Sequence, residues 1–600
     1  MELAAPSLDL LHNHIDITHI PFSDRGSRLL VWQSGGACSL QIKLAERLTT
    51  LEADIEAYLR RPPYIHDMCL VDGEGESLPF DVESSPDRLV FHTRIGDFQL
   101  VFQDRRTISF GLPAGQRCGL RFHVSPQYFL AGEMGGTFKA VRNLDYLSNA
   151  PVVRNRIIPE DGGYRVVIIV DAGEDAAIAL KIYPDNDFLE SVVPFSKAAE
   201  ASSSRWRSWF ERVPAVNERY QKLYAYSWWV MANNLLSPQG NLTFEAMMPS
   251  KIKYVGLWAW DSALHALAYR HIDAELARNQ IRAMLAHQFV NGMVPDAIYD
   301  EGIVATIDHP IAGEVTKPPI FAWAALKLHE ADPDFDFLRE IYVPLARLNA
   351  WWFTFNDDDG DGIVQYNHPY SSGLDDSPMW DYGMPVEAPD INTYLCIQMQ
   401  SLSTIADLLG MRDEAAMWRR RSTALVRRMI KDLWDEESGL FWVMRDDKPV
   451  RVVTPFNLYP LWTGQLPGAM NERLVQTLTD PDRFWGEYRL PSVAYNDPHY
   501  SPDVMWRGPV WANVNYFFIE ALQKVDRPDL ARELRKSTLE LINRHRQIAE
   551  YYDSQTGEIP GTAAEIFGWT AAVFIDLAIQ ESRELAAGEQ LDLININPGS

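Results

Sequence analysis

The chain has 600 residues, with 82 Asp and Glu against 55 Lys and Arg and a formal net charge of -27. A charge of that sign repels phosphate backbones and anionic membrane surfaces, so nucleic acid and membranes are not expected partners. No run approaches the roughly 18 apolar residues that span a bilayer, the N-terminus lacks a signal-peptide pattern, and the four cysteines show no paired spacing. We therefore expect a cytoplasmic protein, too long for a single core.

Residues 1–194 show the pattern of half-buried strands. Apolar and polar residues alternate at 27–33, 88–93, 98–103 and 165–170, and turn signals separate these runs. Ile95-Gly96-Asp97 is typical of a hairpin turn. Strands at this spacing predict an N-terminal antiparallel β-sandwich.

From residue 195 the hydrophobic period becomes helical. Residues 195–215 predict a linker helix, residues 216–585 a helical domain, and residues 586–600 a tail. Amphipathic stretches occur at 218–236, 261–268, 274–289, 321–330, 337–353, 392–409, 414–433, 510–524, 530–543 and 569–579, and 458–478 leaves room for two more helices. About twelve helices joined by long, motif-bearing loops fit a double ring of six inner and six outer helices, and no fixed repeat favours a solenoid.

Two loops carry the candidate catalytic carboxylates. Asp375 lies in Ser371-Ser372-Gly373-Leu374-Asp375-Asp376-Ser377, and Glu550 follows a helical stretch in Ala549-Glu550-Tyr551-Tyr552-Asp553. One carboxyl that protonates a leaving oxygen and a second that attacks or activates water are sufficient to cleave a glycosidic bond. Acids in polar loops are usually only solvated. Asp376 and Glu565 are the rival acid and base, and for Asp376 we expect a turn-capping role through Ser377.

Aromatic residues make up 12% of the chain, with 19 Trp, which suits the packing of sugar rings as well as large cores. Trp258-Ala259-Trp260-Asp261 precedes a helix, where Asp261 would either cap the helix or accept hydrogen bonds from sugar hydroxyls. Trp506-Arg507-Gly508-Pro509-Val510-Trp511 is a second aromatic loop of this kind.

One loop resembles a calcium-binding loop. Asp357, Asp359 and Asp361 occupy positions 1, 3 and 5, and Gly362 occupies position 6, but position 12 is His368 instead of Glu. The alternatives are a structural calcium and a polar turn of solvated acids. We expect no other cofactor.

In this order, these motifs resemble the inverting α-glycosidases of glycoside hydrolase family 63 and their trehalase-like relatives, including mannosylglycerate and glucosylglycerate hydrolases. The resemblance covers residues 223–577 and implies an N-terminal β-sandwich followed by an (α/α)6 barrel. It implies that Asp375 is the general acid and Glu550 the general base. The residues expected to bind the substrate are Tyr254, Trp258, Trp260, Asp261, Lys317, Tyr370, Gly373, Trp506, Arg507, Trp511 and Trp569.

Two positions depart from the trehalase pattern, because Lys317 and Ser371 stand where trehalases have Gln and Glu. Trehalose is therefore not the expected substrate. Lys317 would either meet an anionic aglycone such as a glycerate or pair with a nearby acid. We expect hydrolysis of a terminal α-linked sugar, glucose first, with inversion. The alternatives are a disaccharide phosphorylase and a non-catalytic carbohydrate-binding protein, and the linkage, aglycone and oligomeric state stay open.

Overall fold

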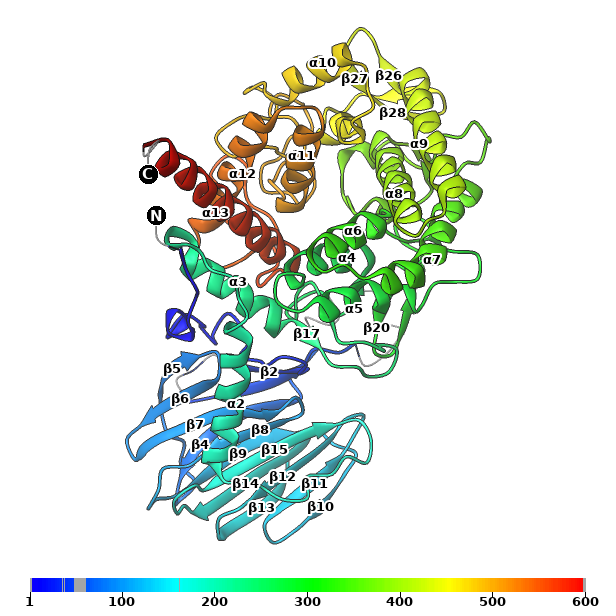
Figure 1. Cartoon of the computed structure of the whole chain (residues 1–600). Coiled ribbons are helices and arrows are strands. Elements are labelled where there is room, and N and C mark those ends of the chain that lie inside the picture. The colour runs from blue at the N-terminus through cyan, green and yellow to red at the C-terminus, as the bar shows by residue number, and fades with distance from the viewer. Residues whose placement is uncertain (1–2, 35, 37, 48–60, 161, 597–600) are drawn as a thin grey trace. The chain divides into compact units, whose positions relative to one another are not determined.

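The computed structural model describes residues 3–34, 36, 38–47, 61–160 and 162–596. The chain divides into two compact units (Figure 1). The β-sheet unit consists of Ala4–Ser237 with Lys251–Val255, and the helical unit consists of Met1–Leu3, Pro238–Ser250 and Gly256–Ser600. The domain boundaries drawn from the sequence stay predictions.

Two antiparallel sheets form the β-sheet unit, as the alternating pattern predicts. The ring of Phe122 in one sheet lies 5.7 Å from that of Tyr146 in the other, so side chains from both sheets share one core. The eight-stranded sheet has the order β10 (Tyr128–Ala131), β11 (Gly135–Lys139), β12 (Asn143–Ser148), β15 (Ala177–Tyr183), β8 (Thr107–Gly111), β7 (Gly96–Asp104), β6 (Arg88–Thr93), β5 (Asp81–Ser85). The six-stranded sheet has the order β13 (Val152–Glu160), β14 (Gly163–Asp171), β9 (Arg117–Val124), β4 (Ile65–Asp72), β3 (Leu40–Leu44), β2 (Leu29–Gln33).

The hairpin between β6 and β7 turns slightly earlier than predicted. Thr93 pairs with Gly96, so Arg94 and Ile95 form the turn in place of Ile95-Gly96-Asp97. Gly96 begins β7 with a φ of 124°, a conformation that suits glycine. The predicted hairpin is thus confirmed, with its turn residues corrected.

The ten helices expected from the 3.6-residue period are confirmed, and nine of them have bounds that shift by a few residues, whereas the last extends from the predicted end at Ile579 to Ile596. The weaker stretch 458–478 contains a 3₁₀ helix, η5, and the helix α10. The helices are η1 (Leu8–Leu11), α2 (Phe195–Phe210), η2 (Glu218–Tyr220), α3 (Gln221–Asn233), α4 (Ala259–Tyr269), α5 (Ala274–Leu285), α6 (Phe321–Ala331), α7 (Phe335–Phe355), η3 (Pro369–Ser372), η4 (Pro378–Trp380), α8 (Pro389–Leu408), α9 (Arg412–Asp432), η5 (Pro455–Thr463), α10 (Gly468–Leu478), α11 (Ala512–Lys524), α12 (Pro528–Asn543) and α13 (Gly568–Ile596).

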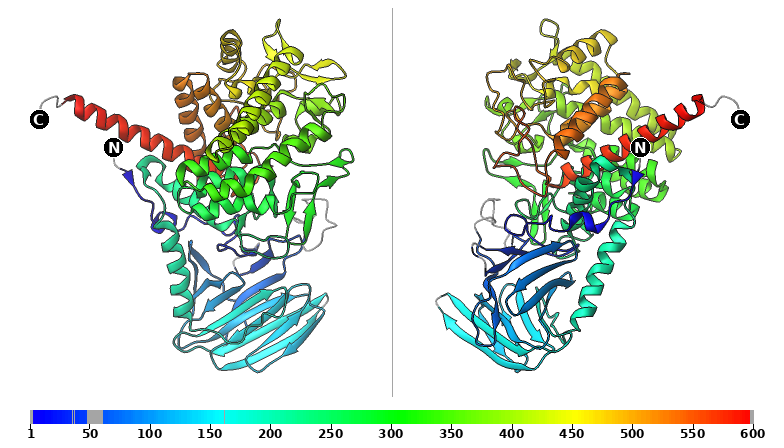
Figure 2. Two further views of the ribbon diagram at one scale, coloured as in Figure 1. Left: turned by 45° about the vertical axis from the view of Figure 1, so that its right-hand side comes forward. Right: turned by 90° about the vertical axis from the view of Figure 1, so that its left-hand side faces the viewer.

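Inside the helical unit, six helices contact one another in a closed sequence. α4 contacts α6, α6 contacts α8, η5 connects α8 with α11, and α13 contacts both α11 and α4. α5, α9, α10 and α12 pack on α4, α8, η5 and α11, respectively, and α7 packs on α6 and α8. In the views of Figure 2, the C-terminal end of α13 projects away from the neighbouring helices. Because α13 extends to Ile596, most of the predicted tail is helical.

Short strands occupy the remaining connections. They are β1 (Leu3–Ala4), β16 (Val216–Asn217), β17 (Leu235–Leu236), β18 (Ala246–Met247), β19 (Leu257–Trp258), β20 (Ala297–Tyr299), β21 (Gly302–Val304), β22 (Thr306–Ile307), β23 (Gly313–Glu314), β24 (Gln365–Tyr366), β25 (Val386–Glu387), β26 (Trp434–Asp435), β27 (Leu440–Phe441), β28 (Val443–Arg445) and β29 (Lys448–Val450).

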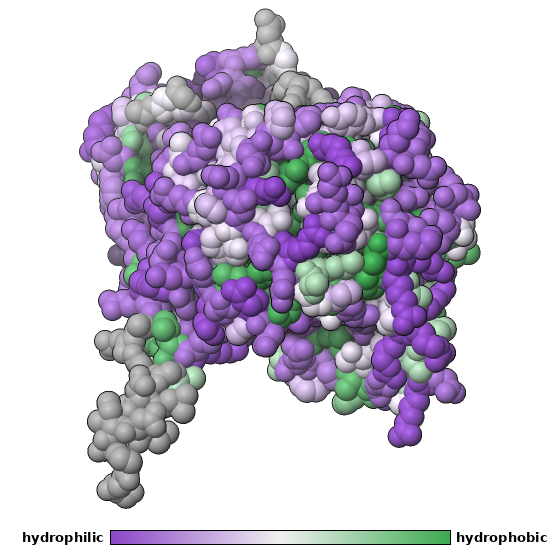
Figure 3. Space-filling view, turned by 90° about the horizontal axis from the view of Figure 1, so that it is seen from above, coloured by the Kyte–Doolittle hydropathy of each residue, from purple (hydrophilic) through white to green (hydrophobic). Residues whose placement is uncertain are grey.

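The surface agrees with the acidic, polar composition. On the face drawn in Figure 3, hydrophilic residues predominate and hydrophobic residues form small separate areas. Within the described ranges, every helix is too short or too polar to cross a membrane.

Candidate active site

The loop that carries Asp375 is held by its own backbone and by a tryptophan. Helix η3 ends at Ser372, and the residue that follows it, Gly373, has a φ of 75°. The Ser372 hydroxyl accepts a hydrogen bond from the Leu374 N–H at 2.9 Å, and the Trp380 indole N–H donates to the Leu374 carbonyl at 2.7 Å. These bonds fix the backbone on the N-terminal side of Asp375.

Gly373 is required by close packing as well as by its backbone angle. A Cβ atom at this position would lie 2.4 Å from Cζ2 of Trp260, which belongs to α4. Only glycine allows the loop to approach the indole this closely. The contact brings the predicted sugar-binding residues Gly373 and Trp260 together next to Asp375.

Glu550 lies in the connection between α12 and α13 and is 2% exposed. One of its carboxylate oxygens, Oε2, accepts a hydrogen bond from the Ala564 N–H at 3.0 Å. The Glu550 N–H in turn donates to the Ala564 carbonyl at 2.9 Å. Two bonds to the same residue therefore hold both the backbone and the carboxylate of Glu550.

Lys317 is a buried cation among the acids of the site. Its ammonium lies 2.7 Å from an oxygen of Asp296 and donates to the Tyr370 carbonyl at 2.5 Å. Burial lowers the pKa of Lys317, but the carboxylates of Asp296, Asp375 and Asp261 together raise it by more. The net shift of the pKa is therefore upward. Of the two roles expected for Lys317, pairing with a nearby acid is the one that the structure shows.

The carboxyl group of Asp375 has the electrostatics of a proton donor. Burial raises its pKa, Lys317 lowers it, and Asp296, Asp376 and Glu550 raise it, to about 6 in total. Its Oδ1 is buried and has no hydrogen-bond partner among the described residues. An acid with a pKa near neutral and a free oxygen can give a proton to a bound substrate.

Asp261 belongs to the same charged cluster. Helix α4 has Trp258 at its N-cap position, so Asp261 lies in the first turn of the helix and not at the cap position itself. Burial raises the pKa of Asp261 well above its usual value; Lys317 opposes this shift, and Glu550 and Asp296 add to it. A carboxyl group can accept hydrogen bonds from ligand hydroxyls in either protonation state, and its protonated form can also donate one.

Aromatic side chains from four loops and helices gather beside these acids. The rings of Trp506 and Trp511 stack with centroids 3.7 Å apart and an interplanar angle of 2°. Trp260 lies edge-on to Trp569 at 5.2 Å, and Tyr551 lies 4.7 Å from Trp511. This aromatic cluster unites four tryptophans that the sequence assigned to sugar binding.

Three other predicted site residues have partners of their own. Arg507 is bound by both oxygens of Asp381, at 2.6 and 2.9 Å. Trp258 packs edge-on against Tyr299 at 5.7 Å. Tyr254 falls in the segment that groups with the β-sheet unit, and the Lys253 ammonium lies over its ring at 5.3 Å.

Asp296 is the residue of this cluster that the sequence patterns did not reveal. It follows Val294-Pro295 and precedes β20, and an acid at the start of a short strand is too common to single out. Asp376, the rival acid, accepts a hydrogen bond from the Trp506 N–H at 2.8 Å, so it connects two loops instead of capping the turn through Ser377.

Residues 254–570, more than half of the chain, match the family model described as the mannosylglycerate hydrolase MGH1-like glycoside hydrolase domain. The chain belongs to this family of glycoside hydrolases. It is 28% identical to the mannosylglycerate hydrolase of Thermus thermophilus over 402 residues, which are 54% of this chain and 95% of that protein.

Two solved structures are similar to this glycoside hydrolase. The GH63 mannosylglycerate hydrolase from Thermus thermophilus, in complex with glucose, matches 59% of this chain and 99% of its own with a TM-score of 0.52 and 25% identity. A bacterial glucoamylase complexed with acarbose matches 96% of this chain and 94% of its own with a TM-score of 0.55. At 10% identity, the second likeness concerns the fold alone.

The predicted calcium loop of this glycosidase brings its acids together. One carboxylate oxygen each from Asp357, Asp359 and Asp361 lies within 4.8 Å of the others. Burial, together with the charges of Asp361 and Asp359, raises the pKa of nearby Glu387 to about 7. Calcium binding stays a prediction, since exposed acidic groups commonly gather without an ion.

Proposed function

We propose that this enzyme hydrolyses the glycosidic bond of a terminal α-linked sugar with inversion at the anomeric carbon. Glucose is the sugar that we propose in the first place. The observation that carries the proposal is the pair of carboxylates. Asp375 has a pKa raised to about 6 and an oxygen without a partner, and the buried Glu550 is one of the charges that raise it. General acid catalysis and general base catalysis require one protonated and one ionised carboxyl group in one site.

In the proposed reaction, Asp375 donates its proton to the glycosidic oxygen as the bond to the anomeric carbon breaks. Glu550 takes a proton from a water molecule, whose oxygen bonds to the anomeric carbon from the opposite face. This single displacement requires the carboxyl groups to be about 6.5–9.5 Å apart, because the water lies between Glu550 and the sugar. Asp261 and the aromatic cluster would bind the sugar.

The proposal includes an (α/α)6 barrel as the scaffold. The closed contact sequence of α4, α6, α8, η5, α11 and α13 supports an inner ring, and helices that pack on its members support an outer layer. The similarity to the glucoamylase structure over nearly the whole chain also favours this fold.

Glucose is proposed as the cleaved sugar because the related Thermus structure is described in complex with glucose. That relative is a mannosylglycerate hydrolase, so a charged aglycone such as glycerate is the natural alternative to a second sugar. Pairing of Lys317 with Asp296 weakens the case for this lysine as the anion-binding residue. We keep the cytoplasmic location as a prediction.

Four variants test the assignment of the carboxylates. Asp375→Asn and Glu550→Gln should each lower kcat on an α-glucoside by about 10²- to 10⁴-fold, with an unchanged thermal unfolding curve. Asp376→Asn and Glu565→Gln, which replace the rival acid and base, should lower kcat by a smaller factor. If either of the first two variants keeps more than about a tenth of the wild-type rate, that residue does not have its proposed role.

A further inference from the structure

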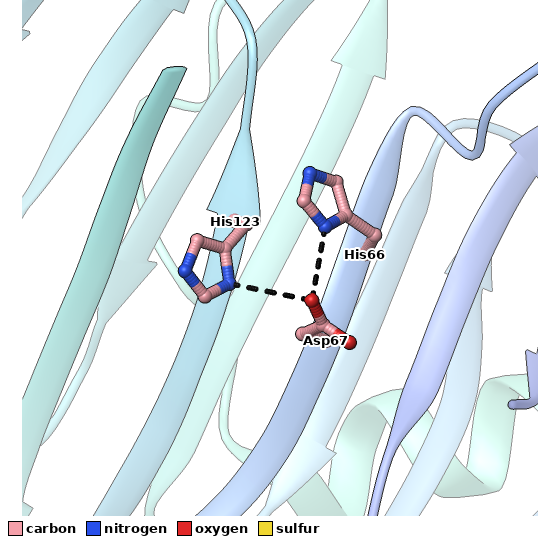
Figure 4. A group of neighbouring side chains, drawn as sticks. All are labelled: His66, Asp67 and His123. Atoms are coloured by element: carbon pink, nitrogen blue, oxygen red, sulfur yellow. Dashed lines mark hydrogen bonds and ion pairs between the residues drawn. The ribbon is translucent and has the colours of Figure 1, made fainter. Parts of the chain in front are cut away.

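The outer side of the six-stranded sheet carries two histidines and an aspartate that converge. His66 in β4 and His123 in β9 are paired directly across the two strands. Asp67 presents its carboxylate between them, with Oδ2 3.2 Å from Nδ1 of His66 and 4.0 Å from Nδ1 of His123 (Figure 4). One ligand atom from each of the three residues lies within 4.8 Å of the others.

A β-bulge brings Asp67 to this side of the sheet. In a regular strand, Asp67 would point to the opposite face from His66. Here the register shifts between His66 and Cys69, because three residues of β4 advance along two of β9. Asp67 adopts a φ of 48°, which is uncommon for a residue other than glycine. Bulges often redirect a side chain, and this one places the carboxylate beside both imidazoles.

A second carboxylate orients His123. Nε2 of His123 lies 2.6 Å from Oε2 of Glu160 in β13, and Arg165 in β14 lies 3.1 Å from the other oxygen of Glu160. Nδ1 of His123, the ring nitrogen on the side of Asp67, is buried and has no hydrogen-bond partner among the described residues. In metal sites, a histidine ligand typically donates its other N–H to a carboxylate in this way.

We propose that His66, Asp67 and His123 bind a divalent transition-metal ion, with Zn²⁺ as the preferred ion. Two imidazole nitrogens and one carboxylate oxygen are ligands that suit zinc, and ligand atoms around a tetrahedral zinc lie roughly 3.3 Å apart, between the two observed distances. The side chain of Asp67 is 67% exposed and that of His66 is 42% exposed, so water can complete the coordination. Bound metal would connect β4 to β9 across the bulge.

The chemistry of the donor atoms separates this site from the acidic loop of the helical unit. Asp357, Asp359 and Asp361 offer only oxygen atoms, which favour calcium or magnesium. Imidazole nitrogens bind calcium poorly, so the two sites should differ in their choice of metal. Zinc binding at the histidine site is independent of the proposed glycosidase reaction.

The test is a calorimetric titration of ZnCl₂ into the untagged full-length protein after removal of metals by dialysis. We expect one Zn²⁺ per chain at the histidine site, and at least roughly tenfold weaker binding in His66→Ala and in His123→Ala. Asp67→Asn should also weaken binding, while it keeps a residue that tolerates a positive φ. The matched control is His92→Ala, since His92 in β6 contacts Asp97 through Nδ1 and Glu83 through Nε2, so its two acidic neighbours lie on opposite sides of the ring and do not converge on one nitrogen.

Three results would overturn the proposal. The dialysed protein binds no Zn²⁺, or the His66→Ala and His123→Ala variants bind it as the wild type does, or His92→Ala weakens binding to the same extent as they do. Absorption spectra of the Co²⁺-loaded protein provide a second measurement that does not depend on affinity. Loss of the Co²⁺ bands in His123→Ala with an unchanged circular dichroism spectrum would support the site, and unchanged bands would contradict it.

Discussion

The charge environment of Asp375 predicts how the activity depends on pH. A general acid must be protonated before the reaction, and the pKa of Asp375 is raised to about 6, chiefly by burial. As the pH rises through this value, the protonated fraction falls, so kcat/KM should decrease on the alkaline side with a midpoint near pH 6. A pH profile of kcat/KM on an α-glucoside checks this prediction.

Replacing two charged neighbours of Asp375 should shift the alkaline midpoint of kcat/KM in opposite directions. Lys317 lowers the pKa of Asp375 and Asp296 raises it. The Lys317→Met variant should therefore move the alkaline midpoint to higher pH, and Asp296→Asn should move it to lower pH. Because breaking a buried ion pair is destabilising, both variants need a folding check by circular dichroism. Shifts in the same direction, or none, would contradict the assignment of this limb to Asp375.

Gly373 provides a further test at the level of one residue. Gly373→Ala adds a Cβ atom 2.4 Å from Trp260, at a backbone φ of 75°. The substitution should lower the free energy of unfolding by about 1–3 kcal/mol and also lower activity, because the loop with Asp375 must move.

Gly410 is the matched control for Gly373. It has a φ of 79°, and an added Cβ atom would have no neighbour within 4 Å. Gly410→Ala should therefore show only the cost of the left-handed backbone, about 1 kcal/mol, with wild-type activity. Equal activity loss in both alanine variants, measured by initial rates, would show that the contact with Trp260 is unimportant.

Among the elements, the helices were the most predictable from sequence. A period of 3.6 residues persists over three or more turns in α7, α8 and α9, so local pattern and tertiary burial agree there. Strand β6 was likewise predicted from strict alternation. The turn after β6 was predicted too late in the chain. Gly96 was assigned to the turn, but it has a positive φ, pairs with Thr93 and is the first residue of β7.

Contacts between distant segments could not be read from the sequence. Lys317 and Asp296 are 21 positions apart, and nothing in either local pattern indicates that they pair. The zinc site was missed for another reason: regular alternation assigns His66 and Asp67 to opposite faces, and only the bulge unites them. The motifs around Asp375 and Glu550 were recognisable because each combines an acid with aromatic or glycine neighbours.

A buried ion cluster should hold three helices of the helical unit together. Asp576 in α13 is fully buried, and its oxygens lie 2.7 Å from Arg270, His271 and Tyr516. Asp576→Asn leaves the Arg270 charge buried without its full partner, so it should destabilise the unit by about 3–5 kcal/mol. Urea denaturation followed by circular dichroism measures the change.

The ion pair between Asp407 and Arg419, which joins α8 to α9, is the control for this prediction. The side chain of Asp407 is 47% exposed, so Asp407→Asn should cost less than about 1 kcal/mol. Similar denaturation midpoints for Asp576→Asn and Asp407→Asn would contradict a structural role for the buried cluster.

At the scale of the whole molecule, the proposed site draws on segments that are far apart in the chain. Asp261, Asp296, Lys317, Asp375 and Glu550 influence one another's charge only because the helical unit is folded. The comparison with mannosylglycerate hydrolase covers 59% of this chain and 99% of that relative. The family match covers residues 254–570, so most of the β-sheet unit lies outside the matched domain. The six-stranded sheet of this unit carries the proposed zinc site, whose residues differ from those of the proposed glycosidase reaction.

The most direct test of the inverting mechanism is proton NMR of the first product released from an α-glucoside, with and without phosphate. The proposed single displacement predicts that β-glucose appears first and mutarotates later, at a rate independent of phosphate. Initial release of α-glucose would contradict inversion, and a sugar phosphate would show that phosphate replaces the water activated by Glu550.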